Sequence, residues 1–357
     1  MKRRTFLRKA IAATGAATLV SRAGPFVHAD DKAGSKNPVI GQGEHRYECI
    51  HGWGELPDGF AWQTTHGVAV DEAGFVYITQ QGHTGKPAID TIVVFDPKGK
   101  FVRSFGKRYF SGGHGIDIRK EGGEEFLYLT NTWRRTFSKT NLKGEVVWTK
   151  AFPDAPNKYT EAEQFSPTNI AFAPDGGFYV ADGYGSHLIH QYDKAAKWVR
   201  TWGGAGKEPG QMQTPHGIWL DNRPGREPSL VVADRANARL QYFTLDGKFL
   251  SLLENAVFFP AHFDIRGDVL LVPDLHARVS LFDKNNKPVV HLGEDPEWRK
   301  TVVDSLGQGK TPVRTRPQDW QAGKFVHPHD ACFDNDGNIF VVEWVATGRV
   351  TLLKHVS

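Results

Sequence analysis

The chain has 357 residues and a formal net charge of +4, with 24% charged and 39% hydrophobic residues. Its basic excess lies before the first acidic residue, Asp30, and consists of Lys2, Arg3, Arg4, Arg8, Lys9 and Arg22. Taking those six charges from +4 leaves about −2 for the rest of the chain, which disfavours a nucleic-acid partner. Two cysteines, Cys49 and Cys332, are too few for a disulfide framework.

The first 29 residues resemble a twin-arginine export signal. A basic stretch over residues 2–9 precedes a mildly apolar run over residues 10–20, and Val27-His28-Ala29 offers a cleavage site. We therefore expect export by the Tat machinery to the periplasm or the exterior; a basic arm on a cytosolic protein is the alternative. Residues 30–44 are polar and are expected to form a flexible lead-in. Nothing later approaches the ~18 apolar residues that span a bilayer.

One eight-residue motif recurs six times along the chain. The copies are TTHGVAVD, GGHGIDIR, SPTNIAFA, TPHGIWLD, PAHFDIRG and HPHDACFD, and their third positions hold His66, His114, Thr168, His216, His262 and His329. Subtracting successive positions gives intervals of 48, 54, 48, 46 and 67 residues. A repeat of this length is typical of propeller blades or solenoid turns.

Each repeat reads as four short strands. The motif lies on the first, and the second strands are expected at Phe75–Thr79, Phe126–Thr130, Phe178–Ala181, Leu230–Ala233, Val269–Val272 and Ile339–Glu343. Hairpins follow at Ile92–Phe105, Leu188–Trp202, Leu240–Leu252 and Val279–Leu292. Two connections are longer: Thr149–Phe165, and Leu292–Phe325 with a short helix expected over Pro296–Asp304.

The two ends of the chain predict how the repeats close. The last repeat stops one strand short, after Val350–Leu353, whereas residues 48–54 resemble the fourth strand of another repeat at residues 199–204. The N-terminal strand should therefore complete the last blade, which makes residues 45–357 an all-β, six-bladed propeller; an open solenoid is the alternative. Cys49 and Cys332 would then lie three strands, or roughly 14 Å, apart, too far for a disulfide.

The aligned histidines predict a metal site. Alternate blades of a six-bladed ring lie about 120° apart, which suits three imidazoles around one ion. His114, His216 and His329 form one such set; His66, Thr168 and His262 form a weaker one, because a hydroxyl replaces an imidazole. Zinc on three nitrogens keeps a fourth position open for catalysis. The alternative is that these histidines only hydrogen-bond to backbone across a narrow channel.

Several stretches resemble the peptidyl-α-hydroxyglycine α-amidating lyases, which are six-bladed propellers of the NHL type. These stretches are residues 181–186 (ADGYGS), residues 232–241 (VADRANARLQ), Pro215-His216 and Pro328-His329-Asp330. The resemblance implies zinc on His114, His216 and His329, and a structural calcium on Val68, Ile116 and Asp330. It also implies Tyr184 as the catalytic tyrosine and Arg235 as a substrate-binding arginine. The implied reaction cleaves an α-hydroxyglycine amide to glyoxylate and a free amide.

The chain also departs from the family pattern. Gln81 stands where a second substrate-binding arginine belongs, and Arg134 or Arg135 is a candidate replacement. His66, His262 and His327 are additional histidines that could bind a second metal or change the substrate. Two other functions stay open: a non-catalytic propeller that binds a peptide or protein, and a propeller hydrolase of the lactonase type.

Overall fold

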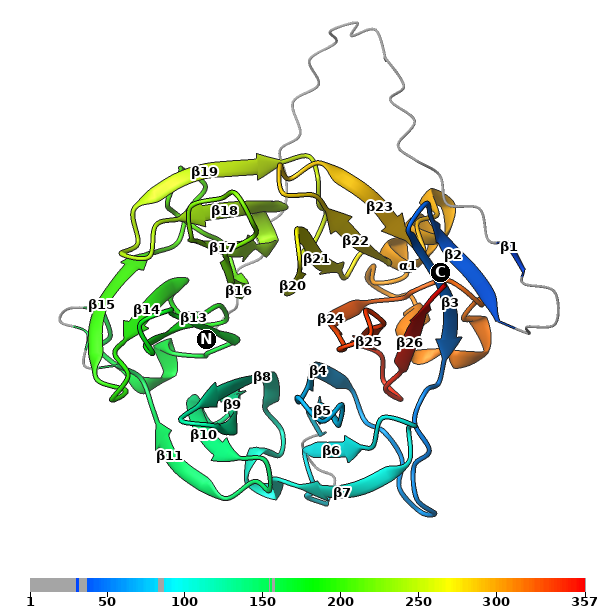
Figure 1. Ribbon diagram of the computed structural model, residues 1–357, viewed down its shortest axis with the longest axis horizontal. Coiled ribbons are helices and arrows are strands. Elements are labelled where there is room, and N and C mark those ends of the chain that lie inside the picture. The colour runs from blue at the N-terminus through cyan, green and yellow to red at the C-terminus, as the bar shows by residue number, and fades with distance from the viewer. Residues whose placement is uncertain (1–29, 32–36, 83–86, 154, 156–157, 357) are drawn as a thin grey trace, which may run out of the picture.

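The computed structural model describes residues 30–31, 37–82, 87–153, 155 and 158–356. The expected export signal over residues 1–29 lies outside this part. Six antiparallel sheets surround a common axis, each with its first strand innermost, which confirms the six-bladed propeller (Figure 1). Among the described helices, none has the length and apolar character needed to cross a membrane.

The first three blades follow one another in chain order. Blade one comprises β4 (Thr65–Val70), β5 (Val76–Gln80), β6 (Ile92–Phe95) and β7 (Phe101–Phe105). Blade two comprises β8 (Gly113–Glu121), β9 (Glu124–Asn131), β10 (Thr136–Asn141) and β11 (Val146–Lys150). Blade three comprises β12 (Asn169–Phe172), β13 (Phe178–Asp182), β14 (Leu188–Tyr192) and β15 (Trp198–Gly203).

Blades four to six repeat the pattern. Blade four comprises β16 (Pro215–Asp221), β17 (Ser229–Asp234), β18 (Arg239–Phe243) and β19 (Phe249–Glu254). Blade five comprises β20 (Asp264–Arg266), β21 (Val269–Asp274), β22 (Arg278–Phe282) and β23 (Pro288–Leu292). Blade six combines β24 (Pro328–Phe333), β25 (Ile339–Glu343) and β26 (Val350–His355) with β3 (His45–His51), β2 (Pro38–Gln42) and β1 (Asp30–Asp31).

Blade six closes the ring by pairing the two ends of the chain, as predicted. β3 lies antiparallel to β26, with Cys49 opposite Leu353. The strand order β3-β26-β25-β24 separates the two cysteines, and both are free thiols.

The expected flexible lead-in is partly wrong. β2 lies within it and pairs with β3, and its Ile40 packs against Leu292 and Phe325 in the core. A run of only three apolar residues, Pro38-Val39-Ile40, is too short to predict a strand from periodicity alone.

The core lies between neighbouring blades rather than within any one of them. For example, Ala181 and Ile189 of blade three pack with Ile218 and Val232 of blade four. Strands that are buried on both faces have continuous runs of apolar residues in the sequence. Each fully buried aliphatic side chain stabilises the folded state by about 1.5–3 kcal/mol. This packing fixes the angular position of each inner strand, and so of the histidine at its start.

The long insertion after β23 contains the expected helix, α1 (Pro296–Asp304). Asp295 caps it by accepting hydrogen bonds from the backbone N–H groups of Glu297 and Trp298, and Pro296 occupies the first turn. Trp298 packs with Val326 and Val345 beside the inner strand of blade six. Four of the 3₁₀ turns are η1 (Lys107–Tyr109), η2 (Ala162–Gln164), η4 (Val313–Thr315) and η5 (Pro317–Asp319); η3 (Arg235–Asn237) follows β17.

Candidate active site

Three histidines from alternate blades form an equilateral group on the propeller axis. His114 lies at the start of β8, His216 at the start of β16 and His329 at the start of β24. Their ring centroids are pairwise 4.8 Å apart. The 120° spacing predicted from the repeats therefore brings the three side chains together.

Each of the three rings is oriented by a backbone carbonyl. The Nδ1–H of His114 donates to Thr168 (2.8 Å), that of His216 to Ala261 (2.7 Å) and that of His329 to His66 (2.7 Å). Because a carbonyl only accepts, the proton of each neutral ring is on Nδ1 and the Nε2 lone pair is left toward the axis. Burial is the first cause that holds the pKa of all three histidines well below the usual value.

This donor set fits a metal ion. The Nε2 atoms of His114 and His216 are 3.2 Å apart, and two nitrogens on one tetrahedral zinc, at 2.0–2.1 Å each, are separated by about 3.3 Å. A carbonyl acceptor on the second ring nitrogen is the usual companion of a metal-binding histidine. The alternative role considered for these histidines was hydrogen bonding to the backbone alone. Those hydrogen bonds are present, but they use Nδ1 and leave Nε2 available to bind a metal.

His66 adds a second way to build a three-histidine set. The donor atoms of His66, His114 and His329 lie within 4.8 Å of one another. His66 differs from the others because its Nδ1 faces Thr64 of its own strand segment, at 3.2 Å. The two sets share His114 and His329. The equal centroid spacing supports His216 as the third member, whereas the cavity lining, which includes His66 but not His216, supports His66.

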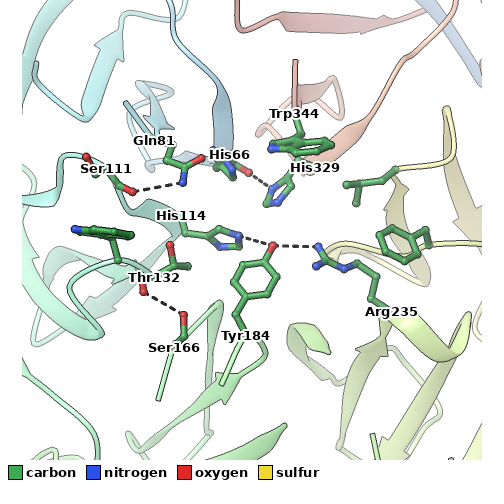
Figure 2. Close-up of a pocket in the computed structure, with 13 residues that line it drawn as sticks. His66, Gln81, Ser111, His114, Thr132, Ser166, Tyr184, Arg235, His329 and Trp344 are labelled. Carbon is green, nitrogen blue, oxygen red and sulfur yellow. Dashed lines mark hydrogen bonds between the residues drawn. The ribbon is translucent and has the colours of Figure 1, made fainter. Parts of the chain in front are cut away.

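Tyr184 and Arg235 converge on the same histidines. The Tyr184 hydroxyl lies 3.0 Å from His216 Nε2. It also lies 3.4 Å from His114 Nε2 and accepts a hydrogen bond from Arg235 Nη1 at 3.2 Å (Figure 2). The guanidinium lies between the rings of Tyr184 and Phe259, 5.1 and 5.0 Å from their centroids. Among the described residues Arg235 forms no ion pair, and its buried Nε has no hydrogen-bond acceptor. A buried guanidinium with donors to spare suits a carboxylate ligand.

A cavity of about 450 Å³ is lined by Tyr184, Arg235, His66, His114 and His329, whereas His216 is not among its lining residues. Gln81 also lines it and donates from Nε2 to the Ser111 carbonyl (Figure 2). The polar lining adds Ser111, Thr132 and Ser166, and the apolar lining consists of Trp133, Phe259, Leu275 and Trp344. The lining therefore combines hydrogen-bonding groups and apolar side chains around three histidines and Arg235.

A second periodic position supplies part of this lining, and three of its residues, Thr132, Leu275 and Trp344, were not predicted from the sequence. Each second strand ends in a fully buried carboxylate or amide: Gln80, Asn131, Asp182, Asp234, Asp274 and Glu343. The cavity residues Gln81, Thr132, Tyr184, Arg235, Leu275 and Trp344 follow directly or after one glycine. Several of the buried groups accept a backbone N–H from the loop before the inner strand of the same blade, as Asp182 does from Ser166 and Asp234 from Gln213.

Other predicted residues do not reach this cavity. Thr168 donates its hydroxyl toward the carbonyls of Ala181 and Pro215, and His262 points away toward Asp117 and Asp330. The second set of His66, Thr168 and His262 is therefore not assembled. Arg135 donates to the carbonyls of Glu163 and Phe165, and neither it nor Arg134 lines the cavity, so neither replaces the missing arginine.

His327 is equally outside the cavity. Its Nδ1 donates to the Leu275 carbonyl at 2.6 Å, and burial lowers its pKa to about 4. It supports the segment that carries Leu275, rather than contributing a side chain to the site.

The residues implied for calcium lie on three neighbouring inner strands. Asp330 on β24 accepts a hydrogen bond from the Val68 N–H on β4 at 2.9 Å, and Ile116 is buried on β8. Val68 and Asp330 line a further cavity of about 290 Å³, together with Asp117, His262 and Asp264. Burial raises the pKa of Asp330 and of Asp264 to about 7, and that of Asp117 well above its usual range.

Known proteins match the chain at low identity. Peptidyl-glycine alpha-amidating monooxygenase of Mus musculus is 29% identical over 76% of this chain and 26% of its own length. Peptidyl-alpha-hydroxyglycine alpha-amidating lyase 1 of Drosophila melanogaster is 26% identical over 78% of this chain and 51% of its own length. The chain thus spans about a quarter to a half of these relatives. No protein-family model matches it.

Solved structures share the fold alone. Virginiamycin B lyase of Staphylococcus aureus superposes with a TM-score of 0.55 over 87% of this chain and 100% of its own, at 13% identity. A gluconolactonase of Xanthomonas campestris gives a TM-score of 0.58 over 94% of this chain and 99% of its own, at 13% identity. Sequence and fold together make the chain a six-bladed propeller distantly homologous, at 26–31% identity, to the peptidylglycine α-amidating enzymes and their lyases.

Proposed function

We propose that this protein is a metal-dependent lyase that cleaves an α-hydroxyglycine amide to a free amide and glyoxylate. The observation that carries the proposal is the convergence of three histidine rings, the Tyr184 hydroxyl and the Arg235 guanidinium, which forms no ion pair among the described residues, beside one cavity. The distant homology to amidating enzymes agrees with this chemistry.

His114, His216 and His329 would hold the metal, and zinc is the ion that three neutral imidazoles and one open position suit best. When bound, zinc supplies Lewis-acid polarisation of the substrate hydroxyl. This role does not depend on any carboxylate, and none lines the 450 Å³ cavity among the described residues.

The remaining steps fall to Tyr184 and Arg235. Tyr184 stands beside the histidines, where its phenolic oxygen, in the deprotonated form, can accept the substrate hydroxyl proton as the C–N bond breaks. Tyr184 then passes this proton to the departing amide nitrogen, which regenerates the phenolate, and the carbon is released as an aldehyde. The hydrogen bond from Arg235 Nη1 stabilises negative charge on the phenolic oxygen, and the remaining guanidinium donors can hold the substrate carboxylate.

Glyoxylate release from a synthetic peptidyl-α-hydroxyglycine tests the proposal directly. Metal-replete protein should release glyoxylate and free amide in equal amounts, whereas a His329→Ala variant should not exceed the spontaneous rate. Equal rates for the two proteins would remove the lyase assignment.

The lactonase-type alternative has less support, because it needs carboxylate and amide ligands for calcium inside the cavity. The lining offers only the Gln81 amide. If the protein binds the peptide substrate but releases no glyoxylate, the result supports the other alternative, a non-catalytic propeller that binds a peptide.

A further inference from the structure

The buried carboxylate that precedes the Tyr184 loop differs from its counterparts in the next three blades. In blades four, five and six an arginine on the adjacent strand lies opposite the carboxylate and pairs with it: Arg239 with Asp234, Arg278 with Asp274 and Arg349 with Glu343. In blade three the residue opposite Asp182 is Leu188, and among the described residues Asp182 forms no ion pair. Asp182 is fully buried, so other hydrogen-bond donors must satisfy it.

Tyr159, in the long connection between β11 and β12, supplies one of these donors. Its hydroxyl donates to Asp182 Oδ2 at 2.8 Å, and the same phenolic oxygen lies 2.6 Å from His190 Nε2. Burial lowers the pKa of His190 to about 3, so its ring is neutral and carries one proton. Because the phenolic proton is used on Asp182, the His190 proton is on Nε2, and Nδ1 accepts from the Thr201 hydroxyl at 2.8 Å. The donors therefore all point from Thr201 through His190 and Tyr159 to Asp182.

Asp182 in turn holds the backbone on both sides of Tyr184. Its Oδ1 accepts the Ser166 N–H at 2.6 Å, and its Oδ2 accepts the Ser186 N–H at 2.7 Å. The Tyr184 N–H donates to the Ser166 carbonyl at 3.2 Å. The backbone of Tyr184 is therefore tied to two segments that one carboxylate fixes, and a shift of that carboxylate would move the phenol relative to the histidines.

We propose that Tyr159 is a positioning residue for the lyase reaction: its hydroxyl takes the place of the arginine of the other blades, holds Asp182 and thereby fixes Tyr184 against the histidines. This inference rests on the function proposed above. Tyr159 is not among the residues that line the 450 Å³ cavity, so it acts through Asp182 and not on the substrate. Its loss should therefore lower turnover and leave substrate binding unchanged.

Two measurements on the full chain test this role: hydrogen exchange of peptides that span residues 182–187, followed by mass spectrometry, and the kinetics of glyoxylate release. In Tyr159→Phe we expect exchange about tenfold faster and kcat about tenfold lower, with unchanged KM and metal content. Tyr77→Phe is the matched control, because it also deletes a buried hydroxyl that donates to a carboxylate, Asp71 at 3.0 Å, outside the cavity lining. It should change neither measurement.

Unchanged exchange in Tyr159→Phe, or equally fast exchange in Tyr77→Phe, would overturn the proposal. A raised KM with unchanged kcat would overturn it too, because Tyr159 would then act on substrate binding. Should Tyr159→Phe not fold, Thr201→Val decides, since it removes the donor that orients His190; unchanged exchange in that variant contradicts the proposal. If the wild-type chain releases no glyoxylate, the lyase assignment fails, whereas faster exchange in Tyr159→Phe would still show that Tyr159 holds the Tyr184 loop.

Discussion

The Nε2 atoms of His114 and His216 lie 3.2 Å apart although each ring already donates its Nδ1 proton to a carbonyl. Two neutral rings in this tautomer present lone pairs to each other, which is unfavourable unless a cation or another donor lies between them. The Tyr184 hydroxyl carries one proton and can donate it to only one of the two. The arrangement therefore favours a positive centre between the two rings.

Metal content should distinguish the two possible histidine sets. We expect His216→Ala to lose the metal of the histidine group and His66→Ala to retain it, because a carbonyl of the next blade orients the His216 ring, whereas the Nδ1 of His66 faces Thr64 of its own blade. Elemental analysis of protein purified without chelator gives the result. Loss in His66→Ala with retention in His216→Ala would assign the metal to His66, His114 and His329.

Removing the Tyr184 hydroxyl should affect turnover rather than binding. Tyr184→Phe keeps the ring against which Arg235 packs but deletes the proton acceptor, so kcat should fall by about 10²–10⁴ with little change in KM. Tyr179→Phe is the control, because its hydroxyl donates to the Leu245 carbonyl away from the cavity. Equal effects of the two changes would argue against proton transfer by Tyr184.

A new arginine at position 81 should improve carboxylate binding. Gln81 lines the cavity and makes only a long hydrogen bond, 3.4 Å, to the Ser111 carbonyl, so its replacement disrupts little. We expect Gln81→Arg to lower KM for a peptidyl-α-hydroxyglycine, because a charged bidentate donor adds about 1.5–3 kcal/mol of binding. Gln81→Lys supplies the charge without the planar fork and should give a smaller gain. An unchanged KM in both variants would show that the substrate carboxylate does not reach position 81.

The loop that carries Tyr184 should be sensitive to one methyl group. A Cβ at Gly185 would lie 2.0 Å from Asp182 Oδ1 and 2.3 Å from the Gln164 carbonyl oxygen. Gly185→Ala should therefore displace the loop and reduce kcat while the metal is retained. Gly307→Ala has 3.2 Å to its nearest neighbour, the Asp304 carbonyl oxygen, and should have little effect. Full activity of Gly185→Ala would mean that the loop does not need this geometry.

Stability should fall in mild acid because buried histidines resist protonation. Burial lowers the pKa of His51 and of His291 to about 4, against about 6.5 in an unfolded chain. Between pH 6.5 and 4 the unfolded chain binds more protons, so the free energy of unfolding decreases as pH falls, by up to about 2 kcal/mol per histidine at pH 5.

Urea unfolding at pH 7 and pH 5 measures this loss. His291→Gln should reduce the difference between the two pH values, whereas substitution of the exposed His355 should not. If His291→Gln leaves the difference intact, other groups cause the loss.

The repeat pattern predicted the ring because every blade must bury both faces against its neighbours. This requirement produces continuous apolar runs in the sequence, such as Ile92–Phe95. It also located His114, His216 and His329, since equivalent strand starts meet on the axis. It misplaced His262, whose ring lies beside Asp117 and Asp330 and not with the other histidines. The residue after the histidine does not decide this, because His329 is followed by Asp330 and still joins His114 and His216. The direction of a side chain is a three-dimensional property that a one-dimensional alignment does not contain.

The pairing of β3 with β26 has a kinetic meaning. The His51 ring and the Thr351 hydroxyl are in contact at 2.8 Å across 300 residues of chain, and contacts so distant in sequence make a protein fold slowly. Because loop-closure entropy rises only with the logarithm of length, this step limits speed more than final stability. His329 enters the axis only with the last blade to be synthesised. A nascent or truncated chain therefore cannot assemble the complete proposed histidine group, and metal uptake would report that the ring has closed.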